Sequence, residues 1–305
     1  MNIVIIGQGA IGLLWYFKLS QQAHNNVSLR CSAKVTNLPE RMTFTDSSQQ
    51  SHQQIIAFAS DEHLQQADLI IYCLKAYALE QAHLQYHPLF NQNATIIFSH
   101  NGLIDIKSFA LPLKKNQANI AMLMTHGSLK TDHFNIMHTG EGHSDIGLIA
   151  GDISANKRST LVKMLNEALP SVTWQQHIKE KQWIKLAINC VINPLTAIHN
   201  CDNGVIANVK FQQEIQAILQ EVVMIARKHE VSLSLHDLTQ TVCKVAQNTA
   251  LNCSSMRSDI HAKRKTEIDH INGFVHQQGA IHNIPTPHNT ALWQQIKKLA
   301  SKNRC

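Results

Sequence analysis

The sequence predicts an α/β domain built on a mainly parallel sheet over residues 1–170, followed by an all-helical domain over residues 171–305. Two observations support this fold class. The first half alternates short apolar runs with helical patterns, which is typical of a parallel sheet with helices on both faces, and the second half shows long helical patterns. A chain of 305 residues also exceeds what one hydrophobic core usually holds. No repeat or low-complexity linker is present, so we expect a tight connection near residues 165–175.

The chain begins with a buried strand, "NIVIIG" at 2–7, and a helix with an apolar face at 10–21. Further apolar runs bounded by polar or turn residues predict strands at 26–31, 54–60, 67–74, 94–100, 119–125 and 144–151. Apolar periodicity predicts helices at 177–193, about 208–230, 236–250 and 258–282. A final helix follows in "PTPHNTALWQQIKKLA", after the prolines of "NIPTP" at 283–287, because proline cannot continue a helix and restrains the residue before it.

The composition narrows the function classes. There is no apolar run of about 18 residues, so no transmembrane helix is expected. The N-terminal apolar run has the length of a strand and lacks the features of a signal peptide. Seven cysteines without a C-x-x-C pair are typical of reduced thiols. We therefore expect a cytoplasmic protein with no membrane partner, either a monomer or a homodimer.

The formal net charge of +6 is modest and favours an anionic small molecule as partner. The densest basic stretch, "HAKRKTEID" at 261–269, has no aromatic-basic platform beside it, so we expect no nucleic-acid binding. None of the 19 histidines stands at H-E-x-x-H or paired Cys/His spacing. We therefore expect no metal site.

"GQGAIG" follows the first strand and opens the first helix, with Gly7, Gly9 and Gly12 at G-x-G-x-x-G spacing. This context is typical of a dinucleotide-binding loop in a Rossmann-type domain. Gly7 allows the turn, Gly9 lets the backbone approach a pyrophosphate, and Gly12 lets the helix pack closely on the strand. A plain strand–helix turn is the alternative. The expected cofactor-binding residues of the loop are Gly7, Gln8, Gly9, Ala10, Ile11 and Gly12.

The end of the second strand distinguishes NAD from NADP. An acidic residue there bonds the ribose 2′-hydroxyl, whereas an arginine accommodates a 2′-phosphate. The chain has "SLRCSAK", with Arg30 in this place and Lys34 nearby, and no Asp or Glu between residues 13 and 39. We therefore predict NADPH as cofactor. An ordinary cation at a strand end is the alternative reading of Arg30.

Two later strands also end in polar residues, at the edge of an open α/β sheet where ligands gather. "CLKAY" at 73–77 places Lys75 there, where it could face the cofactor or be solvated. "FSHNGL" at 98–103 places Asn101 there, followed by Gly102. For an isolated Asn-Gly pair a turn is the simpler reading.

"KQWIKLAINCVINPLTAI" at 181–198 carries three polar residues four positions apart, Lys185, Asn189 and Asn193. On a helix these share one face of an otherwise apolar rod. A partly desolvated lysine is disposed to a lowered pKa, and two amides beside it could hold a polar substrate. A buried polar network between helices is the alternative. We expect Pro194 to kink or stop this helix.

Further polar residues lie in "NCSSMRSDI" at 252–260, with Ser254 and Ser255, and in "KRKTEIDHINGF" at 263–274, with Glu267. Together with "GQGAIG", "CLKAY", "HNGL" and "KLAINCVINPLTAIHNCDNG", these segments resemble the 2-dehydropantoate 2-reductase (ketopantoate reductase) family. The motifs stand in the family's order from residue 7 to residue 274. The lysine–Asn–Asn and T-E-I-D-x-I-N-G segments are far more specific than the glycine motif.

The resemblance implies a Rossmann domain, a helical domain and an active site in the cleft between them. It implies that Lys185 is the general acid and that Glu267 belongs to the catalytic site, with a contact to the cofactor. It also implies substrate contacts from Asn101, Asn189, Asn193, Asn252 and Ser255, and cofactor contacts from Arg30, Lys75, Asn101 and Ser128. The implied reaction is hydride transfer from NADPH to the C2 ketone of 2-dehydropantoate, which gives (R)-pantoate.

The chain departs from the family pattern at two places. It has "NGLID", with Ile104 where relatives often carry a second glycine. "MTHGSLKTD" at 124–132 puts Gly127 and Ser128 in an expected loop where relatives often show alanines. Both departures could shift nicotinamide position or substrate preference. A reductase of another 2-oxo acid and a nucleotide-binding sensor without turnover therefore remain as alternatives.

Overall fold

The structure is a computed structural model that describes residues 1–33, 35–104 and 113–302. Lys34, which the sequence analysis noted near Arg30, lies outside the described residues. The chain divides into two compact units. The sheet unit comprises residues 1–100 and 105–178, and the helical unit comprises residues 101–104 and 179–305. The predicted domain boundary at residue 170 stays a prediction.

The sheet unit is built on a seven-stranded sheet in the order β11-β10-β7-β6-β5-β1-β2. Neighbouring strands are parallel except β10 and β7, so the prediction of a mainly parallel sheet is confirmed. The strands are β1 (Asn2–Ile6), β2 (Asn26–Arg30), β5 (Leu69–Cys73), β6 (Thr95–Ser99), β7 (Ala118–Met124), β10 (Ser144–Gly151) and β11 (Val172–Trp174). All residues of β5 and β6 are buried, as expected for strands covered on both faces.

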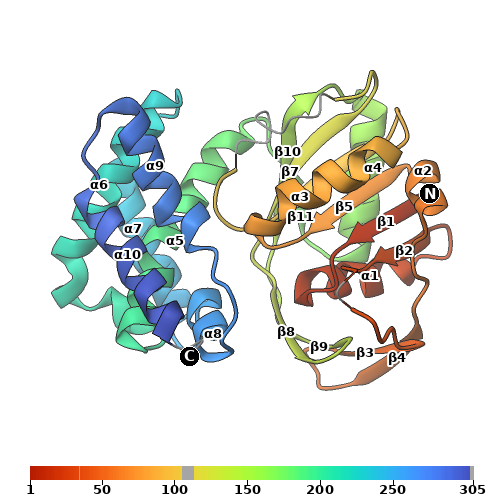
Figure 1. Ribbon diagram of the computed structural model, residues 1–305, viewed down its shortest axis with the longest axis horizontal. Helices are drawn as coiled ribbons and strands as arrows, with labels where there is room; N and C mark the ends of the chain where they lie inside the picture. Colours follow the sequence, from red (N-terminus) through yellow and green to blue (C-terminus); the bar gives the residue numbers. More distant parts are fainter. Residues whose placement is uncertain (34, 105–112, 303–305) are drawn as a thin grey trace. The chain divides into compact units, whose positions relative to one another are not determined.

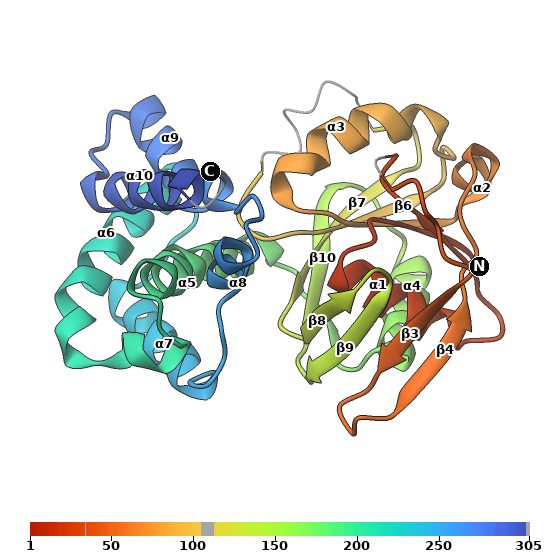
Figure 2. The ribbon, with the colours of Figure 1, turned by 60° about the horizontal axis from the view of Figure 1, so that its bottom comes forward.

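Helices cover both faces of this sheet. Figure 2 shows α3 on one face and α1 with α4 on the other. Helix α1 connects β1 to β2 and helix α3 connects β5 to β6, and these two connections run in opposite directions across the sheet. Because crossovers between parallel strands share one hand, the two helices lie on opposite faces. The helices are α1 (Ala10–Ser20), α2 (Asp61–Gln66), α3 (Ala76–Tyr86), the 3₁₀ helix η1 (His87–Leu89) and α4 (Ala155–Ala168).

A second, four-stranded sheet has the order β4-β3-β9-β8. Its strands are β3 (Arg41–Thr45), β4 (Ser51–Ile55), β8 (Gly127–Asp132) and β9 (Asn135–Gly140). The predicted strand at 54–60 is therefore wrong, because the strand ends at Ile55 and pairs antiparallel with β3. The expected loop at 124–132 is wrong as well, because Met124 ends β7 and Gly127–Asp132 form β8. Both strands are mostly polar and gain their order from pairing with the adjacent strand of a hairpin, β3 for β4 and β9 for β8.

The helical unit surrounds one apolar core, with α5 (Ile178–His199) at its centre in Figure 2. The remaining helices of the unit follow it along the chain (Figure 1). They are η3 (Asn203–Ala207), η4 (Val209–Phe211), α6 (Gln212–Lys228), α7 (Leu235–Asn248), α8 (Ser255–His261), η5 (Ile268–His270), α9 (Asn272–His282) and α10 (Pro287–Lys302). Within the described ranges, no helix is long and apolar enough to cross a membrane.

Two helix predictions in this unit are wrong. The single helix at 258–282 is broken into α8, η5 and α9. Lys263 adopts the left-handed conformation (φ 53°), and the Arg264 amide turns back to the Asp259 carbonyl, which ends α8. The helix predicted at 177–193, with a kink or stop at Pro194, does not end there, because α5 continues to His199.

Candidate active site

The glycine loop has the geometry that its spacing requires. Gly7 adopts φ +121°, and a Cβ there would overlap the Cys73 carbonyl. A Cβ at Gly12 would overlap the Gly7 carbonyl, whereas nothing lies within 4 Å of a Cβ built on Gly9. The turn and the helix packing therefore exclude side chains at Gly7 and Gly12, and the space above Gly9 is open.

This loop fits the phosphates of a dinucleotide. Gly9 is the N-cap of α1, whose first turn carries no acidic residue. The first amides of a helix have no partner within it, and the helix dipole favours an anion at this end. The Gln8 side chain accepts a hydrogen bond from the Ser32 amide (3.1 Å), which ties the loop to the segment after β2.

Arg30 ends β2, and its side chain is engaged by neighbours. It donates to the Ala59 carbonyl (2.8 Å) and to the Asp61 carboxylate (2.8 Å), and it lies over the Tyr86 ring. The sequence analysis found no acid near Arg30 along the chain, but Asp61, at the start of α2, reaches it through the fold. A 2′-phosphate would therefore meet a guanidinium that already has a carboxylate partner.

Strand β8 of the small sheet lies beside the glycine loop. The Ser128 hydroxyl donates to the Ala10 carbonyl (3.3 Å), and the Lys130 ammonium donates to the Gln8 carbonyl (3.2 Å). Residues two apart on a strand share a face, so both side chains point to the loop for the same reason. Sequence analysis named Ser128 but missed Lys130, because the strand was read as a loop.

Lys75 is the N-cap of α3, two residues after β5 ends at Cys73. Because a Cβ on Gly7 would touch Cys73 and Leu74, this segment belongs to the same edge of the sheet as the glycine loop. The position agrees with a lysine near the cofactor.

The polar stripe lies on α5 as predicted. Lys185 and Asn189 are partly buried, and Asn193 is buried. The neighbouring residues of the helix are packed in the apolar core. The Nδ2 atom of Asn189 is buried and has no hydrogen-bond partner. An amide donor without a partner in such a place is costly and is available to an oxygen of a ligand.

Pro194 lies inside α5 and cannot donate to the Cys190 carbonyl one turn earlier. The buried Asn272 side chain takes this place, with its Nδ2 atom 3.0 Å from the Cys190 oxygen. The Thr196 hydroxyl contacts the carbonyls of Ile192 and Asn193, at 2.7 and 3.1 Å. Side chains thus stabilise the turn that carries Asn193.

Asn101 and Glu267 meet although 166 positions separate them. The Asn101 amide donates to the buried Glu267 carboxylate at 3.1 Å. Gly102 makes this possible, because it adopts φ +77° and a Cβ there would overlap the His270 carbonyl. The Leu103 amide donates to the same carbonyl (3.0 Å). Asn101 is thereby part of the helical unit.

Asn252 and Ser255 are exposed around the start of α8. Ser254 is the N-cap of this helix, and its hydroxyl also lies 2.7 Å from the Thr196 hydroxyl. Ser254 is therefore engaged structurally, and Ser255 is presented outward. Sequence analysis overlooked Asn203, whose buried Oδ1 atom has no partner while its Nδ2 atom bonds Thr249. Its position in the quoted "HNCDNG" was the available signal.

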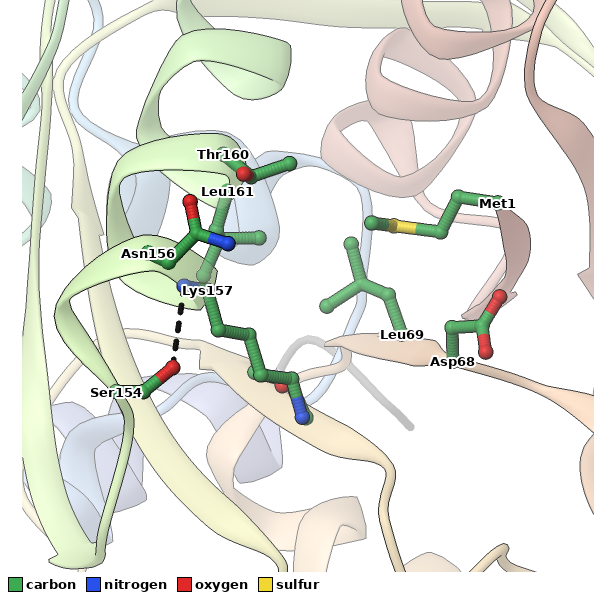
Figure 3. A pocket seen from close by; sticks show the side chains of 9 residues that line it. Met1, Asp68, Leu69, Ser154, Asn156, Lys157, Thr160 and Leu161 are labelled. Carbon is green, nitrogen blue, oxygen red and sulfur yellow. Dashed lines mark hydrogen bonds between the residues drawn. The ribbon is translucent and has the colours of Figure 1, made fainter.

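The pocket in Figure 3 is a different place. It lies at the amino ends of β1, β5 and β6, where Met1, Asp68 and Thr95 line it together with residues of α4. The glycine loop follows the carboxyl end of β1. No predicted site residue lines this pocket. It does not correspond to the ligand edge of an open α/β sheet.

The predicted site residues fall into two groups. The sheet unit holds the glycine loop with Arg30, Lys75 and Ser128. The helical unit holds Asn101, Lys185, Asn189, Asn193, Asn252, Ser255 and Glu267. Among the residues that the structure describes, no group of three His, Cys, Asp or Glu side chains could bind a metal ion.

Comparison with known sequences finds one family in both units. Residues 3–151 match the family model described as "Ketopantoate reductase PanE/ApbA", and residues 177–300 match its C-terminal counterpart. The 2-dehydropantoate 2-reductase of Vibrio cholerae serotype O1 is 36% identical over 301 residues, which cover 98% of each chain. That of Escherichia coli O157:H7 is 33% identical over 306 residues, covering 99% of this chain and 96% of the relative.

Solved structures share the fold over the whole chain. A PanE/ApbA family ketopantoate reductase from Ralstonia eutropha JMP134 matches with a TM-score of 0.86 and 22% identity, covering both chains fully. A D-mandelate dehydrogenase in complex with NADH and anilino(oxo)acetate matches with a TM-score of 0.87 and 20% identity, again over both full chains. The predicted fold class, a Rossmann-type domain followed by a helical domain, is confirmed.

Proposed function

Because the chain belongs to the ketopantoate reductase PanE/ApbA family, we propose that it reduces 2-dehydropantoate to (R)-pantoate with NADPH, in pantothenate biosynthesis. The matched segments include both the glycine loop and the polar stripe of α5. The curated relatives named above carry this activity in their names and are aligned with nearly the whole chain.

The unpartnered amide of Asn189 is the structural observation that carries the proposal. A buried donor without a partner reduces stability, so its presence beside a lysine on an apolar helix favours a role in binding. A ketoacid with hydroxyl and carboxylate oxygens supplies acceptors for this amide. The Asn189 nitrogen takes no part in a hydrogen-bond network of the fold, which supports the substrate reading over that alternative.

The residues then take the following roles. Lys185 donates a proton to the C2 oxygen as the ketone becomes an alcohol. Asn189, Asn193, Asn252 and Ser255 hold the oxygens of the substrate. Glu267 orients Asn101 through the hydrogen bond between them, so that the Asn101 amide has a fixed direction. NADPH, when bound, supplies the hydride that C2 receives.

The sheet unit would hold the cofactor. The glycine loop and the first turn of α1 face the pyrophosphate, Arg30 the 2′-phosphate, and Lys75 and Ser128 the same edge. Six cysteines in the described part of the chain are free thiols, which supports a cytoplasmic location. The proposed assembly is a monomer or a homodimer; a ketopantoate reductase of Staphylococcus aureus with the same fold is described as dimeric.

The direct test is NADPH oxidation with 2-dehydropantoate, for the unaltered chain and for Lys185→Ala. We expect kcat to fall by about 10²–10⁴-fold in this variant, because it loses its proton donor, while NADPH binding is unchanged. Lys181→Ala is the matched control, since Lys181 is an exposed lysine one turn earlier on α5.

The outcomes separate the alternatives. Turnover of another 2-oxo acid in preference to 2-dehydropantoate would change the proposed substrate but not the proposed type of reaction. Tight NADPH binding without turnover on a panel of 2-oxo acids would favour a sensor. Equal activity of Lys185→Ala and Lys181→Ala would remove Lys185 as the acid.

A further inference from the structure

The starting observation is a second cation at the cofactor edge. Lys130 lies on β8, in the small sheet, and its ammonium donates to the carbonyl of Gln8 in the glycine loop at 3.2 Å. It also lies over the Phe134 ring, 5.6 Å from the centroid. The side chain is half-buried, and this burial lowers the pKa of the ammonium. Lys130 is therefore held at the loop rather than extended into solvent.

Lys130 is also near the end of β2, because Gln8, whose carbonyl it contacts, accepts a hydrogen bond through its side chain from the Ser32 amide (3.1 Å). Cys31 is the first residue after this strand. Burial raises the pKa of the Cys31 thiol to about 11, and the positive charges of Lys130 and Arg30 partly oppose this rise. Both cations thus act on one atom at the carboxyl end of β2. This is where the adenosine ribose of a dinucleotide lies in a Rossmann-type domain.

The two cations differ in their partners. Arg30 is paired with the Asp61 carboxylate at 2.8 Å, so the pair carries little net charge. The hydrogen-bond acceptor of Lys130 is a neutral carbonyl. Asp132, on the same strand, acts on Lys130 more weakly than burial does, and its carboxylate also accepts from the His133 amide. Lys130 therefore brings the larger uncompensated positive charge to this corner.

We infer that Lys130 is a specificity-determining residue that contacts the 2′-phosphate and sets the preference for NADPH over NADH. The inference rests on the proposed function, since it assumes an NADPH-binding reductase. A phosphate dianion near β2 gains attraction from Lys130, whereas a free 2′-hydroxyl gains almost none. Arg30, held by Asp61, contributes shape and hydrogen bonds more than net charge.

The test measures binding and needs no turnover. The dissociation constants of 2′,5′-ADP and 5′-AMP, and of NADPH and NADH, are measured by calorimetry for the unaltered chain and for Lys130→Gln. We expect the affinity for 2′,5′-ADP and NADPH to fall about tenfold to a hundredfold, as for loss of a charged hydrogen bond. Affinity for 5′-AMP and NADH should change less than about twofold. Lys130→Arg should retain most of the preference.

Lys163→Gln is the matched control, because Lys163 is a lysine of the same unit whose side chain is 77% exposed on α4. Equal loss for ligands with and without the 2′-phosphate would overturn the inference and place Lys130 at the pyrophosphate. No loss in Lys130→Gln would also overturn it. Failure of the unaltered chain to prefer 2′,5′-ADP would refute NADPH as cofactor, whereas failure to reduce 2-dehydropantoate would leave the inference standing.

Discussion

Asn189 and Asn272 are both asparagines of the helical unit, and their side-chain nitrogens are buried, yet the two nitrogens are in opposite situations. The Asn272 nitrogen has two acceptors, the Cys190 carbonyl and the Asn289 side chain at 2.9 Å. The Asn189 nitrogen has none. The difference supports a structural role for Asn272 and the proposed binding role for Asn189.

At the residue scale we predict that Asn189→Leu raises KM for 2-dehydropantoate at least tenfold without reducing stability. Leucine has a similar volume and removes a buried donor whose desolvation costs about 1–3 kcal/mol. The melting temperature should therefore stay the same or rise. Steady-state kinetics and thermal unfolding check this. A drop in melting temperature with unchanged KM would show that the amide is structural.

The glycine loop and the stripe on α5 were both recognisable from the sequence, because each depends on short-range spacing. Asp61 and Lys130 were not, since they reach Arg30 and the glycine loop from α2 and from the second sheet. The pairing of Asn101 with Glu267 could be expected from the family resemblance but not from chain positions so far apart. Spacing along the sequence could not predict these residues, because long-range tertiary contacts bring them to their places.

At the scale of elements, the same distinction between short-range sequence patterns and tertiary contacts holds. Six of the seven strands of the large sheet were predicted, among them the continuous apolar runs of β5 and β6, whereas the three-residue strand β11 was missed. In β3 only Met42 and Phe44 are buried, and β4 is polar throughout except for its last residue. These strands exist because they pair, so periodicity gives little signal. In the same way, Pro194 argues locally for a helix end, and a buried side chain from α9 overrides it.

The helix α5 therefore depends on Asn272 because of Pro194. We predict that Asn272→Leu destabilises the chain by about 2–3 kcal/mol, since it leaves the Cys190 and Asn289 oxygens without this donor. In a Pro194→Ala background, the amide at position 194 can donate to the Cys190 carbonyl. The same substitution should then cost about 1 kcal/mol less.

A double-mutant cycle in urea measures this coupling. Additive effects of the two substitutions would mean that Asn272 acts through Asn289 and not through the carbonyl that Pro194 leaves unpaired. Asn272 is fully buried, so it does not contact a substrate itself. A lower kcat in Asn272→Leu than in Pro194→Ala would therefore indicate that the Asn272 side chain positions the turn that carries Asn193.

At the scale of the whole molecule, buried histidines make the sheet unit sensitive to acid. His83 packs on His87, with ring centroids 4.5 Å apart, and His126 lies near His138 at 5.6 Å. All four are buried in the sheet unit. Burial lowers the pKa of His83 and of His126 from 6.5 to about 4 in each case, and the neighbouring histidine adds to the effect. Lys18 and His143 lower the pKa of His126 further, and Glu141 raises it.

These shifts predict that the chain loses stability as the pH falls from about 6.5 to about 4. In that window the unfolded chain binds protons that the folded chain does not, so unfolding is favoured. At pH 5 His83 and His126 should each cost on the order of 1–2 kcal/mol relative to pH 7. His83→Phe, which keeps a ring beside Tyr72 and Phe98, should flatten this dependence, and the exposed His24→Gln should not. Urea unfolding of the unaltered chain and the two variants at pH 7 and pH 5 tests this. An equal loss of unfolding free energy in all three proteins would assign the acid sensitivity to other groups. His270 of the helical unit is one such group, because burial lowers its pKa as well.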